Sequence, residues 1–252
     1  MTALYETLPI EFDCARCASD DKGAELVRLF DTLRPLQTFV LVTREEPTSL
    51  LQRLQEERSG LFQWASIEAG PPVWKIEIAR RAARAGEPVK ITEAVEWDHD
   101  RLDRLERTAF DAWGAGDSAS AEAAFARFAH GLRRHVGFEE ALLFPEYERR
   151  NGTASDSGAT AALRTEHRQI LALVAAIERT IRTDAVPVHV LHSYLRDVLR
   201  DHNRKEEETL YPVTDSVLTG SQRDDLMRRV QLFHSGRTVT PDVEGRVPVG
   251  AV

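Results

Sequence analysis

Two segments of the chain repeat a pattern of histidine and glutamate that can bind metal. Residues 135–145 read His-Val-Gly-Phe-Glu-Glu-Ala-Leu-Leu-Phe-Pro, and residues 202–212 read His-Asn-Arg-Lys-Glu-Glu-Glu-Thr-Leu-Tyr-Pro. Both fit His-x3-Glu-Glu-x2-Leu-aromatic-Pro. A histidine and a glutamate four residues apart lie one above the other on a helix face, so both can reach one ion. Imidazole with carboxylate is a good ligand set for iron, zinc, copper or nickel.

A single histidine precedes each segment at nearly the same distance. His99 lies 36 positions before His135, and His167 lies 35 positions before His202. Each half of this region therefore supplies one histidine from one helix and a histidine–glutamate pair from the next. Packed antiparallel, the halves bring together four imidazoles and two carboxylates, those of His99, His135, Glu139, His167, His202 and Glu206. One zinc ion usually takes four ligands, so this set suits two metal ions.

These six ionisable residues occupy positions at which the surrounding pattern requires apolar side chains. Burying such groups without partners costs several kcal/mol each, so they must be paired, neutral or bound to metal. A set of hydrogen-bonded polar core residues is the alternative to a metal site. Six residues in register within a duplicated pattern favour metal. Suppose that both carboxylates bridge the two metal ions and that an oxide or hydroxide also bridges these ions. Each ion then has five ligands, and an octahedral ion keeps one open position.

Long helices are predicted to position these residues. Apolar residues recur at steps of three and four over residues 91–109, 125–142, 163–181 and 191–210, which is typical of a helix face turned to a core. Gly116, Gly152 and Pro187 lie between these stretches. The pattern predicts an antiparallel up-down-up-down four-helix bundle over residues 91–233, including a short extra helix at 221–233. Pro145 and Pro212 are expected to kink or end two of the helices.

The first 80 residues predict a small α+β domain in front of the bundle. Its shorter elements follow the order βαβαββ, with strands at 8–12, 38–42, 62–67 and 73–78 and helices at 22–33 and from Pro47 through Leu54. Residues 81–90 predict a linker, and residues 234–252 predict a disordered tail. The fold class is therefore mainly α.

Charge and hydropathy exclude several classes of protein. The chain has 33 basic and 41 acidic residues, for a net charge of −8, which argues against binding to nucleic acid or to anionic lipids. No apolar run approaches the roughly 18 residues that a membrane helix needs, and the N-terminus does not resemble a signal peptide. We expect a cytoplasmic protein.

Other polar residues have simpler interpretations. Cys14 and Cys17 form no disulfide framework. They are a redox pair, half a zinc site or ordinary thiols, and the helix predicted after them would lower a thiol pKa. Glu140 and Glu207 adjoin the predicted carboxylate ligands but lie about 100° around the helix, so they are expected beside the ligands or at the surface, with Glu207 the better substitute ligand. The remaining histidines are predicted to be surface or capping residues: His130, His189, His192 and His234.

The single-histidine helices and the doubled His-x3-Glu motif resemble the hemerythrin-like, or HHE cation-binding, domains over about residues 89–215. The resemblance implies a non-haem di-iron centre whose ligands map to the six residues named above. The N-terminal half resembles an uncharacterised small domain found alone or fused to hemerythrin domains, through Gly-Leu-Phe-Gln-Trp at 60–64 and Gly-Pro-Pro-Val-Trp-Lys-Ile at 70–76. Its fold resembles that of the small βαβαββ sulfur carriers, without their cysteine-proline motif.

One departure from the family bears on function. The O2-carrying hemerythrins have a fifth histidine one turn after that of the third helix, where this chain has Leu171. The ligand set resembles instead the four-histidine, two-glutamate centres of iron–sulfur repair proteins linked to nitric oxide stress. We expect a di-iron protein that binds O2 or NO as a sensor, store or scavenger, with the small domain docking a protein partner or relaying the state of the iron.

Two alternatives stay open from the sequence. The first is a repair factor that donates iron to damaged iron–sulfur clusters or reduces NO or peroxide. The second is a scaffold bundle with a non-iron or degenerate metal site. Because the first alternative shares its ligands with the expected O2 or NO site, the sequence separates those two poorly.

Overall fold

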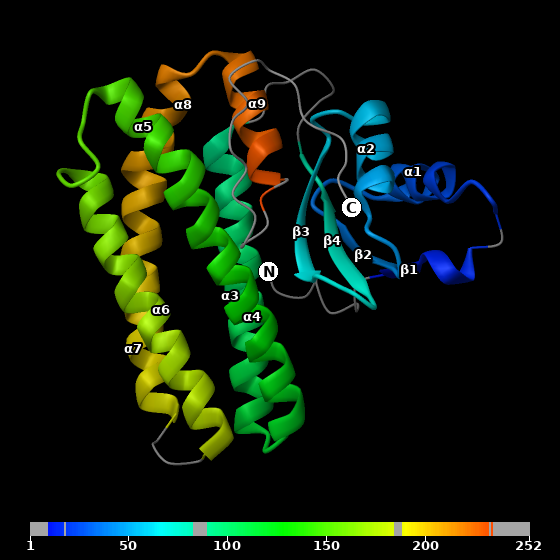
Figure 1. Ribbon diagram of the computed structural model, residues 1–252. Helices are drawn as coiled ribbons and strands as arrows, with labels where there is room; N and C mark the ends of the chain where they lie inside the picture. Colours follow the sequence, from blue (N-terminus) through cyan, green and yellow to red (C-terminus); the bar gives the residue numbers. More distant parts are fainter. Residues whose placement is uncertain (1–9, 18, 83–89, 184–187, 232, 234–252) are drawn as a thin grey trace.

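The computed structural model describes residues 10–17, 19–82, 90–183, 188–231 and 233. A small four-stranded sheet domain lies beside a bundle of long helices (Figure 1), which confirms the predicted fold class. Most of the predicted linker and the whole predicted tail lie outside the described residues. Among the residues that are described, no helix combines the length and the apolar character needed to cross a membrane.

The small domain has the predicted βαβαββ order. Its strands and helices are β1 (Ile10–Asp13), α1 (Lys22–Thr32), β2 (Thr38–Thr43), α2 (Thr48–Glu57), β3 (Phe62–Glu68) and β4 (Trp74–Arg80). The strand order is β1-β2-β4-β3, with β1 parallel to β2 and the other pairs antiparallel. Phe30 of α1 and Leu54 of α2 are fully buried against the sheet, in one apolar cluster with Phe39 and Ile78. Burial of such side chains is worth about 2 kcal/mol each.

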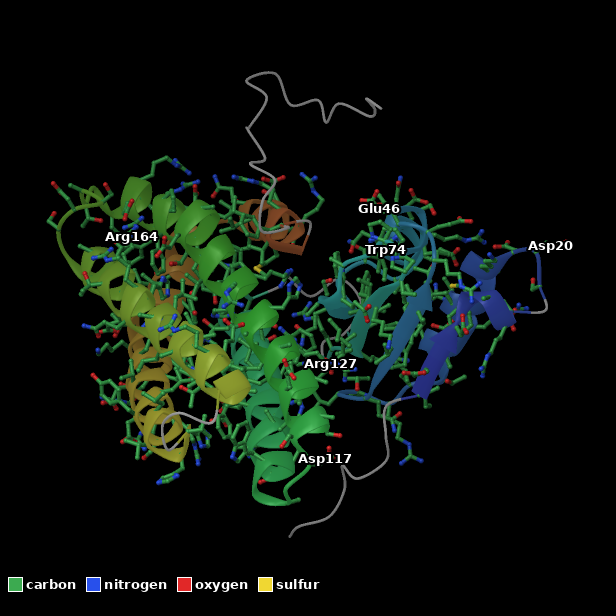
Figure 2. The ribbon with its side chains drawn as sticks, turned by 60° about the horizontal axis from the view of Figure 1, so that its bottom comes forward. Asp20, Glu46, Trp74, Asp117, Arg127 and Arg164 are labelled. Carbon is green, nitrogen blue, oxygen red and sulfur yellow. The ribbon has the colours of Figure 1, made fainter. Side chains whose placement is uncertain are left out.

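Four long helices form the bundle, and five shorter segments of the described residues extend it. They are α3 (Ile91–Gly114), α4 (Ser118–Phe138), η2 (Glu139–Leu143), α5 (Phe144–Asn151), α6 (Ala159–Thr183), α7 (Val188–Lys205), η3 (Glu206–Leu210), α8 (Tyr211–Val217) and α9 (Gly220–Gln231). Helix α3 packs along α4, and α6 packs along α7. Figure 2 shows Asp117, at the start of α4, and Arg164, near the start of α6, at opposite ends of the bundle. The four long helices therefore alternate in direction, as predicted.

Two apolar clusters fill the bundle on either side of its middle. One contains Val95, Phe138 and Leu163, and the other contains Leu102, Leu132 and Ile170. On each of the helices α3, α4 and α6, a short polar stretch therefore lies between residues of the first cluster and residues of the second cluster. The apolar clusters supply the packing that holds these polar stretches at one level of the bundle.

Both halves of the bundle contain a π-helical turn at the repeated motif. The segments η2 and η3 start at Glu139 and Glu206, and in each the next helix begins with an aromatic residue followed by proline. The backbone N–H of Phe144 donates to the carbonyl of Glu139, five residues earlier, and Tyr211 does the same to Glu206. The chain therefore continues as helix past both prolines, so of the two predicted alternatives, a kink or an end of the helix, the end is wrong. Such π-helical turns frequently occur at functional sites.

The sheet domain packs against the bundle through strand β3. Residues 62–66 of β3 are all buried, because α1 and α2 cover one side of the sheet and the bundle covers the other (Figure 1). A cavity of about 30 Å³ lies between β3 and helices α3, α4 and α9. Phe233, just after α9, lies against Gly137 of α4.

Close packing of α3 on α4 gives the first prediction. A Cβ atom at Gly131 would lie 2.8 Å from Leu102 Cδ2 and 2.9 Å from Arg101 Nη2. Both neighbours are buried, and Asp98 holds Arg101 in place. We expect Gly131→Ala to destabilise the protein by about 1–3 kcal/mol, measured by urea unfolding, although alanine is normally the better helix former.

Gly114 is the matched control, since no atom lies within 4 Å of a Cβ built there. Gly114→Ala should leave stability unchanged or raise it by up to about 1 kcal/mol. Equal effects of the two substitutions would contradict this account of the α3–α4 contact.

Candidate metal centre

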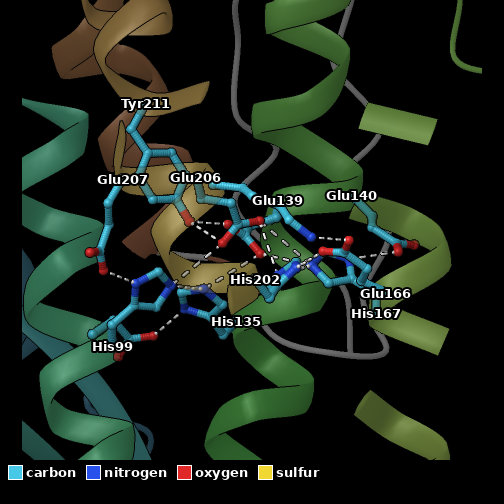
Figure 3. Close-up of polar contacts among 12 residues, drawn as sticks. His99, His135, Glu139, Glu140, Glu166, His167, His202, Glu206, Glu207 and Tyr211 are labelled. Carbon is cyan, nitrogen blue, oxygen red and sulfur yellow. Dashed lines mark hydrogen bonds and ion pairs between the residues drawn. The ribbon is translucent and has the colours of Figure 1, made fainter. Parts of the chain in front are cut away.

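The six predicted site residues meet in the middle of the bundle, and all six are buried. Two overlapping groups have ligand atoms within 4.8 Å of one another, one made by Glu139, His167, His202 and Glu206 and the other by His99, His135 and Glu206. Figure 3 shows the imidazoles in two pairs with the two glutamates between them. Each pair joins one histidine of a single-histidine helix to one of a His-x3-Glu motif.

A carboxylate from a neighbouring helix binds the Nδ1 atom of every imidazole. The pairs are Glu207–His99 at 2.6 Å, Asp98–His135 at 2.9 Å, Glu140–His167 at 2.9 Å and Glu166–His202 at 3.0 Å. Followed in turn, these bonds lead from α3 to α4, from η2, which continues α4, to α6, from α6 to α7, and from η3, which continues α7, back to α3. We call this closed set the carboxylate ring. It ties the four long helices together at the level of the site.

The carboxylate ring fixes which nitrogen of each imidazole carries the proton. An ionised carboxylate only accepts hydrogen bonds, so each Nδ1 donates and each Nε2 is left with its lone pair. The Nε2 atoms then face each other, 3.0 Å apart for His99 and His135 and 3.1 Å apart for His167 and His202. Two facing lone pairs repel unless a proton or a metal ion lies between them. Carboxylate-bound histidines of this kind are characteristic of metal ligands.

The two central glutamates are fully buried and have unusual partners. Both Glu139 and Glu206 are 0% exposed, and the ion pairs among the described residues give them no lysine or arginine. Glu139 Oε2 lies 3.4 Å from His135 Nε2 and 3.3 Å from His167 Nε2. Glu206 Oε1 lies 3.2 Å from His202 Nε2, and its Oε2 lies 3.7 Å from His99 Nε2. Each carboxylate therefore reaches toward both imidazole pairs.

Tyr211 closes the site on the side of the π-helical turns. Its hydroxyl donates to Glu206 Oε2 at 2.9 Å and also contacts Glu139 Oε1 (Figure 3). Burial raises the pKa of Tyr211 well above its usual range, and the two glutamates add to the effect. The equivalent residue in the first motif is Phe144, which stacks on His167. The two halves therefore differ at this position.

The ionisation of the site follows from this geometry. Burial acts to lower the pKa of His167, but the adjacent carboxylates of Glu139 and Glu140 stabilise its protonated form, outweigh burial and raise the pKa to about 9. The pKa values of His99 and His202 are raised for the same reason, since carboxylates outweigh burial. Burial acts to raise the pKa of Glu139, but the imidazoles lower it to about 2.

The residues present fit a pair of metal ions. Two buried carboxylates need positive charge close by, and four lone pairs need an electrophile. Glu139 Oε2 and Glu206 Oε1 are buried without a hydrogen-bond partner among the described residues. Protons can fill these places in the metal-free protein, and metal cations can displace them.

The sequence pointed to the six central residues but not to all of their supports. Glu140 and Glu207 lie beside the predicted ligands, as expected, and each binds a histidine of another helix. Asp98, Glu166 and Tyr211 were not predicted as part of the site. The available signal was the acidic residue directly before both single histidines, in Asp98-His99 and Glu166-His167.

The prediction that the remaining histidines are surface or capping residues is confirmed only in part. His189 is exposed, as predicted, and His234 lies outside the described residues. His192 is not a surface or capping residue: it is half-buried, stacks on Phe110 and contacts the buried Glu106.

The pKa values of the two cysteines differ from expectation. Cys14 and Cys17 are free thiols beside a short 3-10 turn, Cys14–Arg16, before α1. Burial raises the pKa of Cys14 to about 11, and it also raises the pKa of Cys17. The expected lowering by a helix N-terminus is therefore wrong, because desolvation and neighbouring acids outweigh it.

A four-helix bundle with histidines and glutamates converging on its axis defines a class of metal-binding helical proteins. Residues 90–214 match the family described as hemerythrin HHE cation binding domain, and this part of the chain belongs to that family. Residues 11–80 match a family described as an uncharacterized conserved protein (DUF2249). Comparison with curated proteins and with solved structures finds no match.

The carboxylate ring predicts that residues outside the central six control metal affinity. Removing a carboxylate that orients a metal-bound histidine typically costs about tenfold to hundredfold in affinity. We expect Glu166→Ala to weaken metal binding by this amount in a competition titration with a chelator, because His202 loses its Nδ1 partner.

Glu178→Ala is the matched control, since Glu178 is another glutamate of α6 and pairs with Arg133 away from the site. It should leave the affinity for metal unchanged. An unchanged affinity in Glu166→Ala would argue against an orienting role.

The raised histidine pKa values predict how the metal-free protein responds to pH. A histidine whose pKa is higher in the folded protein than in the unfolded chain stabilises the fold below the unfolded value of about 6.5 and loses this effect as pH rises. The melting temperature of the metal-free protein should therefore fall between about pH 6.5 and the His167 value of about 9. The fall should be smaller in His167→Gln. A melting temperature that rises across this range would contradict the assignment.

Proposed function

We propose that the bundle holds two iron ions through His99, His135, Glu139, His167, His202 and Glu206, and binds O2 or NO there as a sensor, store or scavenger. The observation that carries this proposal is the convergence of four Nε2 atoms on two buried carboxylates that pair with no lysine or arginine among the described residues. When bound, two ferrous ions would supply electrons and open coordination positions for such a ligand. The chain's own residues would orient the imidazoles and exclude bulk water.

The ligand set and the family support iron. Four imidazoles and two carboxylates exceed the four ligands that one zinc ion usually takes, and imidazole with carboxylate suits iron. The two Nε2 atoms of each imidazole pair, 3.0 or 3.1 Å apart, are close enough for one ion to bind both. Residues 90–214 match a hemerythrin HHE cation binding domain.

Leu171 supports an open site. It follows His167 by one helical turn, the place of the fifth histidine of O2 carriers, and it packs in the apolar cluster of the bundle instead. The six residues therefore leave both ions without a further histidine. This same observation favours the second candidate, a repair factor that donates iron to iron–sulfur clusters or reduces NO or peroxide.

We further propose that the small domain docks a protein partner or relays the state of the iron. Two sets of polar contacts on α3, one to the sheet and one to the site, support a relay. Arg104 of α3 lies 3.7 Å from Glu77 of β4, and Arg101, one turn before Arg104, donates to Asp98, which binds His135. The free thiols suit a reducing compartment such as the cytoplasm.

Metal content tests the proposal directly. The purified wild-type protein should contain about two iron ions per chain and no comparable zinc, measured by elemental analysis. His135→Ala should lose most of the metal, because one Nε2 ligand and the Asp98 contact both disappear. A zinc-filled protein, or one without metal, would support the scaffold alternative.

His130→Ala is the matched control, since His130 is half-buried on the same helix and is not part of either ligand group. It should retain the metal. Visible spectra recorded after O2 or NO is added and then removed separate the two functions. Reversible changes favour sensing or storage, and irreversible oxidation with loss of iron favours repair.

A further inference from the structure

One cavity of the bundle leads from the surface to the metal centre. It is a groove of about 640 Å³ between helices α3 and α7. One end is lined by Glu106 and His192, and the other reaches His99 and Glu207 at the site. The walls between these ends carry charged side chains of both signs, including Asp103 and Arg200. Such walls stay hydrated and admit small polar or neutral molecules.

A second, much smaller cavity lies inside the bundle against the imidazoles. Its volume is about 10 Å³, room for a molecule about the size of water. It touches His99, His135 and His202, and most of its remaining wall is apolar, including Phe128 and Ile170. A water molecule or an ion would find few partners there, because burial of a polar species without hydrogen bonds is costly. We call this cavity the apolar chamber.

The groove and the apolar chamber adjoin. They share four lining residues, His99, Asp103, Leu199 and Asn203. His99 belongs to the proposed ligand set, so Asp103, Leu199 and Asn203 are the side chains that separate the two spaces. Leu199 is 8% exposed and Asp103 is exposed, which places Leu199 at the inner side. By contrast, the cavity between β3 and the bundle is lined by none of the six central residues.

We infer that a neutral diatomic ligand, O2 or NO, reaches the centre through the α3–α7 groove, passes Leu199 and occupies the apolar chamber beside the imidazoles. This inference rests on the proposed function and adds the entry route and the selectivity of the site. The apolar chamber favours uncharged ligands over anions of similar size, because an anion would lose its hydration on entry.

Rates of NO binding to the iron-loaded protein test the route. Stopped-flow absorbance should show that Leu199→Ala raises the association and dissociation rate constants several-fold and by the same factor. The Kd and the spectrum at saturation should stay as in the wild type, since a barrier has changed and the ligands have not. Leu195→Ala is the matched control: Leu195 lies one turn earlier on α7, is fully buried and lines neither space.

Asp103→Trp provides a second variant at an exposed position, where folding tolerates a large side chain. It should slow both rate constants equally, whereas Asp111→Trp, on the same helix but away from both spaces, should not. Wild-type rates in both Leu199→Ala and Asp103→Trp would overturn the route and leave the proposed function standing. A wild-type protein that loads iron but binds neither NO nor O2 would overturn the proposed function and the route together.

Discussion

The carboxylate ring is the constraint on which the rest of the site depends. An imidazole can present either nitrogen, and only a partner on Nδ1 makes the other nitrogen available to a metal. Here each partner comes from the next helix around the bundle, so the orientation of every imidazole depends on the packing of two helices. Asp98 is in turn held by the buried Arg101, and Glu166 contacts Lys205. The bundle and the metal centre therefore stabilise each other.

Different parts of the fold stabilise the bundle and position the ligands. Apolar clusters on either side of the site supply stability, which lets six ionisable residues occupy the middle of a packed bundle. The π-helical turns begin at Glu139 and Glu206, the residues that reach toward both imidazole pairs. Tyr211 donates to one of these carboxylates where the first half has Phe144. The two halves are alike in their ligands and differ in what surrounds them.

Much of this arrangement could be predicted from spacing within the sequence. Periodicity predicted the four long helices, and the duplicated His-x3-Glu motif predicted which residues converge. The partners of Nδ1 could not be predicted, because Asp98 binds a histidine of another helix and periodicity does not say which helices are neighbours. The π-helical turns were missed because proline was expected to kink or end a helix, and the wider turn in front of each proline leaves no mark in the periodicity. His192 was misassigned because its contact with Glu106 joins residues distant in the chain.

The central claim is that one set of six side chains holds two cations. Anomalous diffraction at the iron edge, from crystals of the iron-loaded protein, tests it most directly. The account predicts two peaks, one bound by Nε2 of His99 and His135 and the other by Nε2 of His167 and His202, with a glutamate reaching both. A single peak, or peaks bound through Nδ1 or outside the bundle, would contradict it.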